Sequence, residues 1–185
     1  MRRKAILFLF IISFFNLNAQ SYLKLNGVMA GLGIFNAGVE VGASSHHTYQ
    51  LDITVSPWQE YLHENAPFII TLGTIGARYY PKEKFNGFYI GPTVGYAAYK
   101  MQRFDYWGSD AYQFGSSVFL GADMGYFMRY KRWSFEPTIA FGWHYGIYEG
   151  HRLSTGDRYD WYPGKYNISA EWLPFKGGLM IGYTF

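Results

Sequence analysis

Two histidine-containing segments of the 185-residue sequence contain residue types suited to catalysis. His144 and Glu136 fall on the same face of one alternating segment. They are eight residues apart, roughly 26 Å along an extended strand, so they cannot form a catalytic pair. A hydrogen-bonded histidine in a polar interior is the better interpretation. The adjacent His46 and His47 point apart in an extended chain and are interpreted as a solvated turn.

Other reactive side chains fall in expected loops. Ser154, His151 and Asp157 are the nucleophile, base and acid that a lipid-modifying enzyme would need, but all three lie on one loop without a strand-borne partner. Five loop residues are metal-ligand types without the local spacing of a ligand motif: His63, Glu64, His151, Asp157 and Asp160. We therefore expect no catalytic residue, cofactor or metal site, and a protein that is not an enzyme.

Composition narrows the class of protein. Aromatic residues make up 22% of the chain, which suits membrane-interface girdles or a ligand-stacking surface. The chain has no cysteine, which excludes disulfides, thiolate metal sites and thiol nucleophiles. The formal net charge is +3. Without Arg2, Arg3 and Lys4 it falls to about zero, so no basic patch indicates nucleic-acid binding.

The first 19 residues have the pattern of a cleaved secretory signal. Three basic residues precede an apolar run over 5–15, which is too short to span a membrane as a helix. A small residue, Ala19, then stands at the expected cleavage point. The expected organisation is a signal peptide over 1–19 and a single domain over 20–185.

The segment 133–148 shows the dominant pattern of the chain. Its odd positions are apolar or aromatic, whereas its even positions are mostly small or polar and include Glu136 and His144. Such period-two alternation is typical of a β-strand with two unlike faces. The segment exceeds the roughly 9–11 residues that a tilted strand needs to cross a membrane. A soluble lipocalin-like barrel would turn the aromatic face inward, and a membrane barrel would turn it towards lipid.

Similar alternation predicts eight strands, over 22–31, 37–43, 48–57, 67–80, 87–99, 112–130, 133–148 and 171–185. The connections after the second, fourth and sixth strands are short, and those after the third, fifth and seventh are longer. An even strand count and this asymmetry are typical of bacterial outer-membrane barrels. We therefore expect an all-β, eight-stranded, antiparallel, up-and-down transmembrane barrel. Pro92, Pro137 and Pro174 fall inside strands and should lie at bulges or where no donor is needed.

The inward positions predict the content of the barrel. They include four bases and four acids: Lys24, Glu40, Asp52, Arg78, Asp123, Arg129, Glu136 and Lys176. Eight strands leave room only for side chains, and charges in such an interior are costly unless paired. We expect a filled polar lumen with a balanced salt-bridge network and no open pore.

The last strand and the long loops carry the residues that we expect to contact other molecules. The last strand is expected to turn Leu173, Phe175, Leu179 and Ile181 outward. Its closing Tyr183 and Phe185 resemble the C-terminal assembly signal that outer-membrane insertion machinery recognises. Aromatic and basic residues mark the loops, and they either contact a protein or glycan partner or pack on one another as a cap: Phe104, Tyr106, Trp107, Arg158, Tyr159, Trp161 and Tyr162.

An ordered set of landmarks over nearly the whole mature chain resembles a known family. They are NAGVE at 36–40, RYY at 78–80, FNGFYIG at 85–91, G-x-x-x-GY at 121–126, RWSFE at 132–136 and GYTF at 182–185. This resembles a small outer-membrane barrel family, domain of unknown function 3575, and more broadly the OmpA-like and OmpW-like eight-stranded barrels. The resemblance implies a barrel fold and a location in the lipid of the outer membrane of a Gram-negative bacterium. It implies no catalytic residue.

The expected role is structural, adhesive or complex-anchoring, with the aromatic loops presented outside the cell. Two alternatives stay open at this point. One is transport of small hydrophobic solutes through the barrel wall, and the other is an outer-membrane enzyme that modifies lipid.

Overall fold

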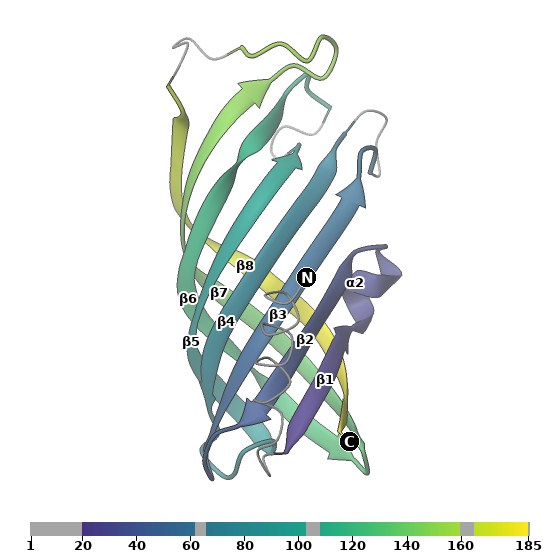
Figure 1. The fold of residues 1–185 in the computed structure, drawn as a ribbon, viewed down its shortest axis with the longest axis vertical. Coiled ribbons are helices and arrows are strands. Elements are labelled where there is room, and N and C mark those ends of the chain that lie inside the picture. Colours follow the sequence, from purple (N-terminus) through teal and green to yellow (C-terminus); the bar gives the residue numbers. More distant parts are fainter. Residues whose placement is uncertain (1–19, 62–65, 103–107, 160–164, 185) are drawn as a thin grey trace, which may run out of the picture.

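The structure is a computed structural model that describes residues 20–61, 66–102, 108–159 and 165–184; the expected signal peptide lies outside them. Eight antiparallel strands form one sheet, and β1 also pairs with β8, so the sheet closes into a ring (Figure 1). The strands are β1 (Ser21–Asn26), β2 (Phe35–Gly42), β3 (His47–Trp58), β4 (Phe68–Tyr79), β5 (Gly87–Met101), β6 (Tyr112–Tyr130), β7 (Trp133–His151) and β8 (Asn167–Thr184). The predicted all-β fold with eight antiparallel strands is confirmed.

Short and long connections lie at opposite ends of the ring. The turns that follow β2, β4 and β6 share one end with the start of β1 and the end of β8 (Figure 1). The last of these turns has only two residues, and Lys131 takes a φ of 56° there. The longer connections after β3, β5 and β7 lie at the other end. We call these ends the tight-turn end and the loop end.

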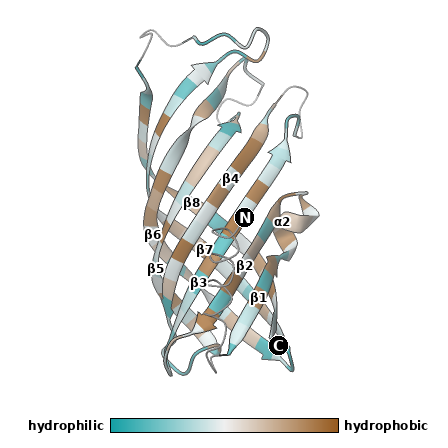
Figure 2. Ribbon diagram, viewed as in Figure 1, coloured by the Kyte–Doolittle hydropathy of each residue, from teal (hydrophilic) through white to brown (hydrophobic). Residues whose placement is uncertain are grey.

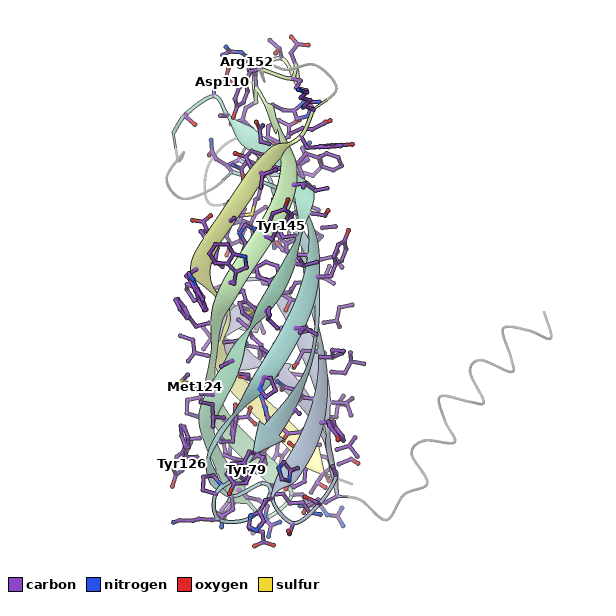
Figure 3. All side chains as sticks on the ribbon, turned by 90° about the vertical axis from the view of Figure 1, so that its left-hand side faces the viewer. Tyr79, Asp110, Met124, Tyr126, Tyr145 and Arg152 are labelled. Carbon is purple, nitrogen blue, oxygen red and sulfur yellow. The ribbon has the colours of Figure 1, made fainter. Side chains whose placement is uncertain are left out.

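The two faces of the sheet differ along nearly every strand. On β7, Trp133, Ile139 and Trp143 are exposed on the outside, whereas Glu136 and His144 are buried inside. The alternation appears as successive bands of opposite hydropathy in Figure 2. Outward tyrosines lie near both ends, with Tyr79 and Tyr126 at the tight-turn end and Tyr145 towards the loop end (Figure 3). The outer surface is therefore apolar, and the inner face carries the charges. No helix in the described ranges is long and apolar enough to cross a membrane.

The three prolines that were predicted to interrupt strands lie at irregular points of the pairing. The pairing of β6 with β7 passes from Gly125↔Thr138 to Met128↔Phe135, so it skips the position of Pro137. The pairing of β4 with β5 likewise skips Pro92. Pro174 adjoins a register shift between β7 and β8. Each of these three prolines therefore lies at or beside an interruption of the regular pairing, where a missing N–H is best tolerated.

Two predicted segments are wrong. The first predicted strand continued to residue 31, but β1 ends at Asn26, and helix α2 (Gly27–Gly31) follows. The Asn26 side chain accepts a hydrogen bond from the Met29 N–H at 3.2 Å, which is a helix N-cap that competes with strand pairing. Beyond Asn26, α2 packs beside β8 in place of a strand.

The second error concerns the orientation of β8. A bulge gives Phe175 no partner, because Ala140 pairs with Lys176 and Phe141 pairs with Pro174. Phe175 therefore packs inside against Phe119, with ring centroids 5.0 Å apart, and does not face outward. The shift of one residue turns Leu173 inward as well and exposes Trp172 and Pro174 in their place.

Close backbone approach inside the ring yields a prediction. A Cβ at Gly142 would overlap the Cα of Gly121 and the Leu120 carbonyl oxygen on β6, so the backbone would have to move. We expect Gly142→Ala to lower the free energy of unfolding by about 1–3 kcal/mol. Gly73→Ala is the matched control, because a Cβ there meets nothing within 4 Å. Urea unfolding in detergent micelles measures both variants, and equal midpoints would contradict the close approach.

Candidate functional site

A network of buried charges fills the half of the ring near the tight turns. Three cations and four carboxylates come from seven different strands, and each is at most 5% exposed: Lys24, Glu40, Asp52, Arg78, Asp123, Glu136 and Lys176. The remaining strand, β5, contributes Tyr89, whose hydroxyl donates to Glu136 at 2.7 Å. Every strand of the ring therefore has a side chain in the network.

Arg78 is the centre of this network. Its guanidinium forms ion pairs with Glu40 at 2.5 Å, Asp123 at 2.7 Å and Glu136 at 2.8 Å. Its Cζ also lies 4.1 Å from the centroid of the Tyr89 ring. A planar guanidinium with five donors can satisfy several carboxylates at once, which a point-like ammonium cannot do as well.

The two lysines extend the network in opposite directions. Lys24 on β1 bridges Glu40 and Glu136, and so ties β1 to β2 and to β7. Lys176 on β8 pairs with Asp52 on β3 at 2.7 Å and lies 3.9 Å from Asp123. The Lys24 pairs join strands that are adjacent or separated by one strand in the ring, whereas the Lys176–Asp52 pair reaches from β8 across to β3 and so braces the cross-section.

Neutral donors compensate for the one carboxylate in excess of the cations. Tyr80 donates to Glu40 at 2.8 Å, and Thr138 donates to Asp123 at 2.8 Å. Thr48 and Gln50 donate to Glu40 and Asp123 respectively. Because a buried carboxylate without donors costs several kcal/mol, these bonds are required by the packing and not incidental to it.

An aromatic cluster closes the ring beneath the charges. Its members are fully or almost fully buried, at 0–3% exposure: Tyr22, Tyr80, Phe85, Tyr89 and Phe127. Phe85 reaches the cluster from the turn after β4 with a φ of 61°. The interior is therefore filled by aromatic rings next to the tight turns and by paired charges on the side of those rings that faces the loop end.

The predicted charge balance needs one correction. Seven of the eight predicted charges lie in the network, but Arg129 is exposed near the end of β6. Its position has the inward parity, yet the strand has passed beyond the closed interior there, so its guanidinium stays in solvent. The buried set accordingly has three bases and four acids, where the sequence predicted four of each.

One buried serine–histidine pair was missed. Ser117 Oγ lies 2.8 Å from His144 Nε2 inside the ring. The two residues come from β6 and β7, and their proximity depends on a pairing register that the sequence does not contain. His144 and Glu136 are far apart along β7, as expected.

The loop residues considered for catalysis do not form a triad. Ser154 donates its hydroxyl to Asp110 at 2.7 Å, while the His151 ring lies against Glu149 and the Gly156 carbonyl oxygen. The two hydrogen bonds from the Ser154 side chain and N–H lower the pKa of Asp110. Arg152 approaches the same carboxylate at 3.7 Å, and both residues lie at the loop end in Figure 3. This cluster joins the loops after β5 and β7. Among the described residues, no group of three His, Asp or Glu side chains is placed to hold a metal.

Most of the predicted contact residues lie outside the described residues, namely Phe104, Tyr106, Trp107, Trp161 and Tyr162, as does Phe185 of the assembly signal. Of the rest, Tyr159 is 39% exposed, and Arg158 pairs with Glu149 at 2.8 Å. Tyr183 lies on the last strand, with its ring 5.1 Å from that of Trp133.

The network predicts a large cost for removing its centre. Arg78→Met leaves three buried carboxylates short of a partner, and we expect a loss of about 3–5 kcal/mol in the free energy of unfolding. Arg129→Met removes the same charge from the surface and should change stability by less than about 0.5 kcal/mol. Urea titration followed by tryptophan fluorescence in micelles compares the two, and similar midpoints would mean that Arg78 is not the centre of the network.

Comparison with known proteins gives one family. The sequence profile described as "Protein of unknown function (DUF3575)" matches residues 5–185. No curated protein matches the chain. No solved structure matches it either. Since the profile covers nearly all of the sequence, the chain belongs to the DUF3575 family of proteins of unknown function.

Proposed function

We propose that the protein is an integral outer-membrane β-barrel of a Gram-negative bacterium with a structural, adhesive or complex-anchoring role. The observation that carries the proposal is the reversed distribution of polarity. Leu51, Ile75 and Leu120 are each more than half exposed on the outside, while Glu40, Asp123 and Glu136 are completely buried. A soluble protein of this size would bury the first group and expose the second.

The extent of the apolar outer face supports lipid as its solvent. Exposed large apolar or aromatic side chains occur on every strand, from Leu23 on β1 to Trp172 on β8. Monomeric soluble proteins rarely expose an apolar patch larger than a few hundred Å². A closed sheet also satisfies the condition that hydrocarbon imposes on a spanning backbone, which is pairing of its polar groups.

The filled interior favours an anchoring role over an open pore. The aromatic cluster and the charge network together fill the interior of the ring near the tight-turn end. Their side chains are almost completely buried. Moving a solute past them would require breaking several buried ion pairs. Rigid bracing of this kind suits a barrel that holds its loops in a fixed arrangement.

The loop end is the part of the molecule suited to a partner. The loops after β5 and β7 are joined through Asp110 and Ser154, so they present one composite surface. Tyrosine and arginine side chains are over-represented at recognition sites, and Tyr159 and Tyr166 are exposed here. The partner class we propose is a protein or glycan outside the cell, with outer-membrane lipid around the ring and insertion machinery needed for assembly.

Fractionation of expressing cells tests the proposal. We expect the mature protein in the outer-membrane fraction, resistant to extraction by urea at high pH and released by detergent. Unheated samples should migrate differently from boiled ones in electrophoresis, because a closed barrel resists unfolding by the detergent. Recovery in a detergent-free soluble fraction would contradict the proposal.

A further inference from the structure

The charges at the two ends of the ring differ in how they are partnered. Among the described residues at the tight-turn end, five cations accompany a single exposed acidic side chain, Glu83; the cations are Lys82, Lys84, Arg129, Lys131 and Arg132. We call these five residues the basic rim. In the part of the chain that the structure describes, none of them forms an ion pair with an acidic side chain. The rim therefore presents positive charge to whatever lies beside it.

The loop end shows the opposite arrangement. There Arg158 pairs with Glu149 at 2.8 Å, and Arg152 approaches Asp110 at 3.7 Å. Further carboxylates, Glu60 and Asp157, are exposed nearby. Among the described residues of that end, basic and acidic side chains occur in similar numbers, so in the described part of the chain the excess of positive charge lies at the tight-turn end.

The basic rim adjoins a belt of outward aromatic side chains. Tyr79, Tyr126, Tyr130 and Trp133 are between 44% and 64% exposed, and Figure 3 places Tyr79 and Tyr126 at this end. Tyrosine and tryptophan on an outer barrel face prefer the level of lipid headgroups. If the ring is embedded as proposed, the cations just beyond the belt lie at the depth of the phosphates.

Two rim cations are held against the belt instead of extending away from it. Lys131 Nζ lies 5.4 Å from the centroid of the Tyr130 ring, and Arg132 Nη1 lies 3.5 Å from the Tyr183 hydroxyl oxygen. The rim is spread over the turns after β4 and β6, so it spans the part of the ring from β4 to β7. A ligand that matches two separated groups of cations beside an aromatic belt is a layer of anions alongside the barrel, not a single compact acidic group.

From these features we infer that the basic rim binds the phosphates of anionic glycerophospholipids in the leaflet at the tight-turn end. The inference rests on the proposed membrane location and adds a lipid preference to it. Each Lys or Arg near an anionic bilayer surface strengthens binding roughly fivefold. The rim would thereby fix the depth of the barrel and enrich anionic lipid around one end.

Spin-labelled lipids test this preference directly. The full mature protein is reconstituted in phosphatidylcholine bilayers, and electron paramagnetic resonance measures the motionally restricted fraction of labelled phosphatidylglycerol relative to labelled phosphatidylcholine. We expect phosphatidylglycerol to be favoured about fivefold over phosphatidylcholine. In a variant with Arg129→Gln, Lys131→Gln and Arg132→Gln, which keeps Lys82 and Lys84, the ratio should fall by at least half, and 0.5 M salt should weaken the wild-type preference.

A matched variant removes three cations from the loop end, through Lys100→Gln, Arg152→Gln and Lys165→Gln, and should keep the wild-type ratio. A wild-type ratio of one, or a rim variant that keeps the wild-type ratio, would overturn the inference while leaving the membrane location intact. If neither label shows a restricted component, the protein is not embedded, and the proposed function fails with the inference.

Discussion

The structure depends on one constraint, which is that seven charged side chains share an interior closed to water. Arg78, Lys24 and Lys176 satisfy Glu40, Asp52, Asp123 and Glu136 only when strands from all around the ring are in place. Glu136, for example, is 112 residues from Lys24 in the chain and bonded to it in the fold. The complete network therefore exists only in the closed sheet.

This coupling explains why the interior is polar although polar interiors are expensive. A buried ion pair contributes little net stability compared with well-packed apolar groups, but a buried charge without its partner is strongly unfavourable. A ring closed in the wrong register would leave several carboxylates unpaired. The network thus penalises incorrect closure, while the aromatic cluster at the tight-turn end supplies favourable apolar burial.

Much of this fold can be predicted from period-two alternation, because alternation alone decides which residues share a face. It placed Glu136 and His144 inside and Trp133 and Trp143 outside. Alternation fails where the regular period is interrupted. The Asn26 cap begins a helix where a strand was predicted. The bulge at Phe175 exchanges the inward and outward positions of β8 on its N-terminal side. Arg129 has the correct parity but lies beyond the end of the closed interior. The identity of the ion-pair partners could not be predicted, since it depends on contacts across the ring between strands remote in sequence.

The central claim is that the apolar outer face of the closed ring meets lipid. The chain has no native cysteine, so single cysteines can be introduced at Leu51, Ile75 and Leu120 and labelled with an environment-sensitive fluorophore. In bilayers that contain lipids with spin labels on their acyl chains, the account predicts blue-shifted emission and strong quenching at all three positions. A label at Ser45, in the turn after β2, should show neither. Water-like emission without quenching at Leu51, Ile75 and Leu120 would contradict the account.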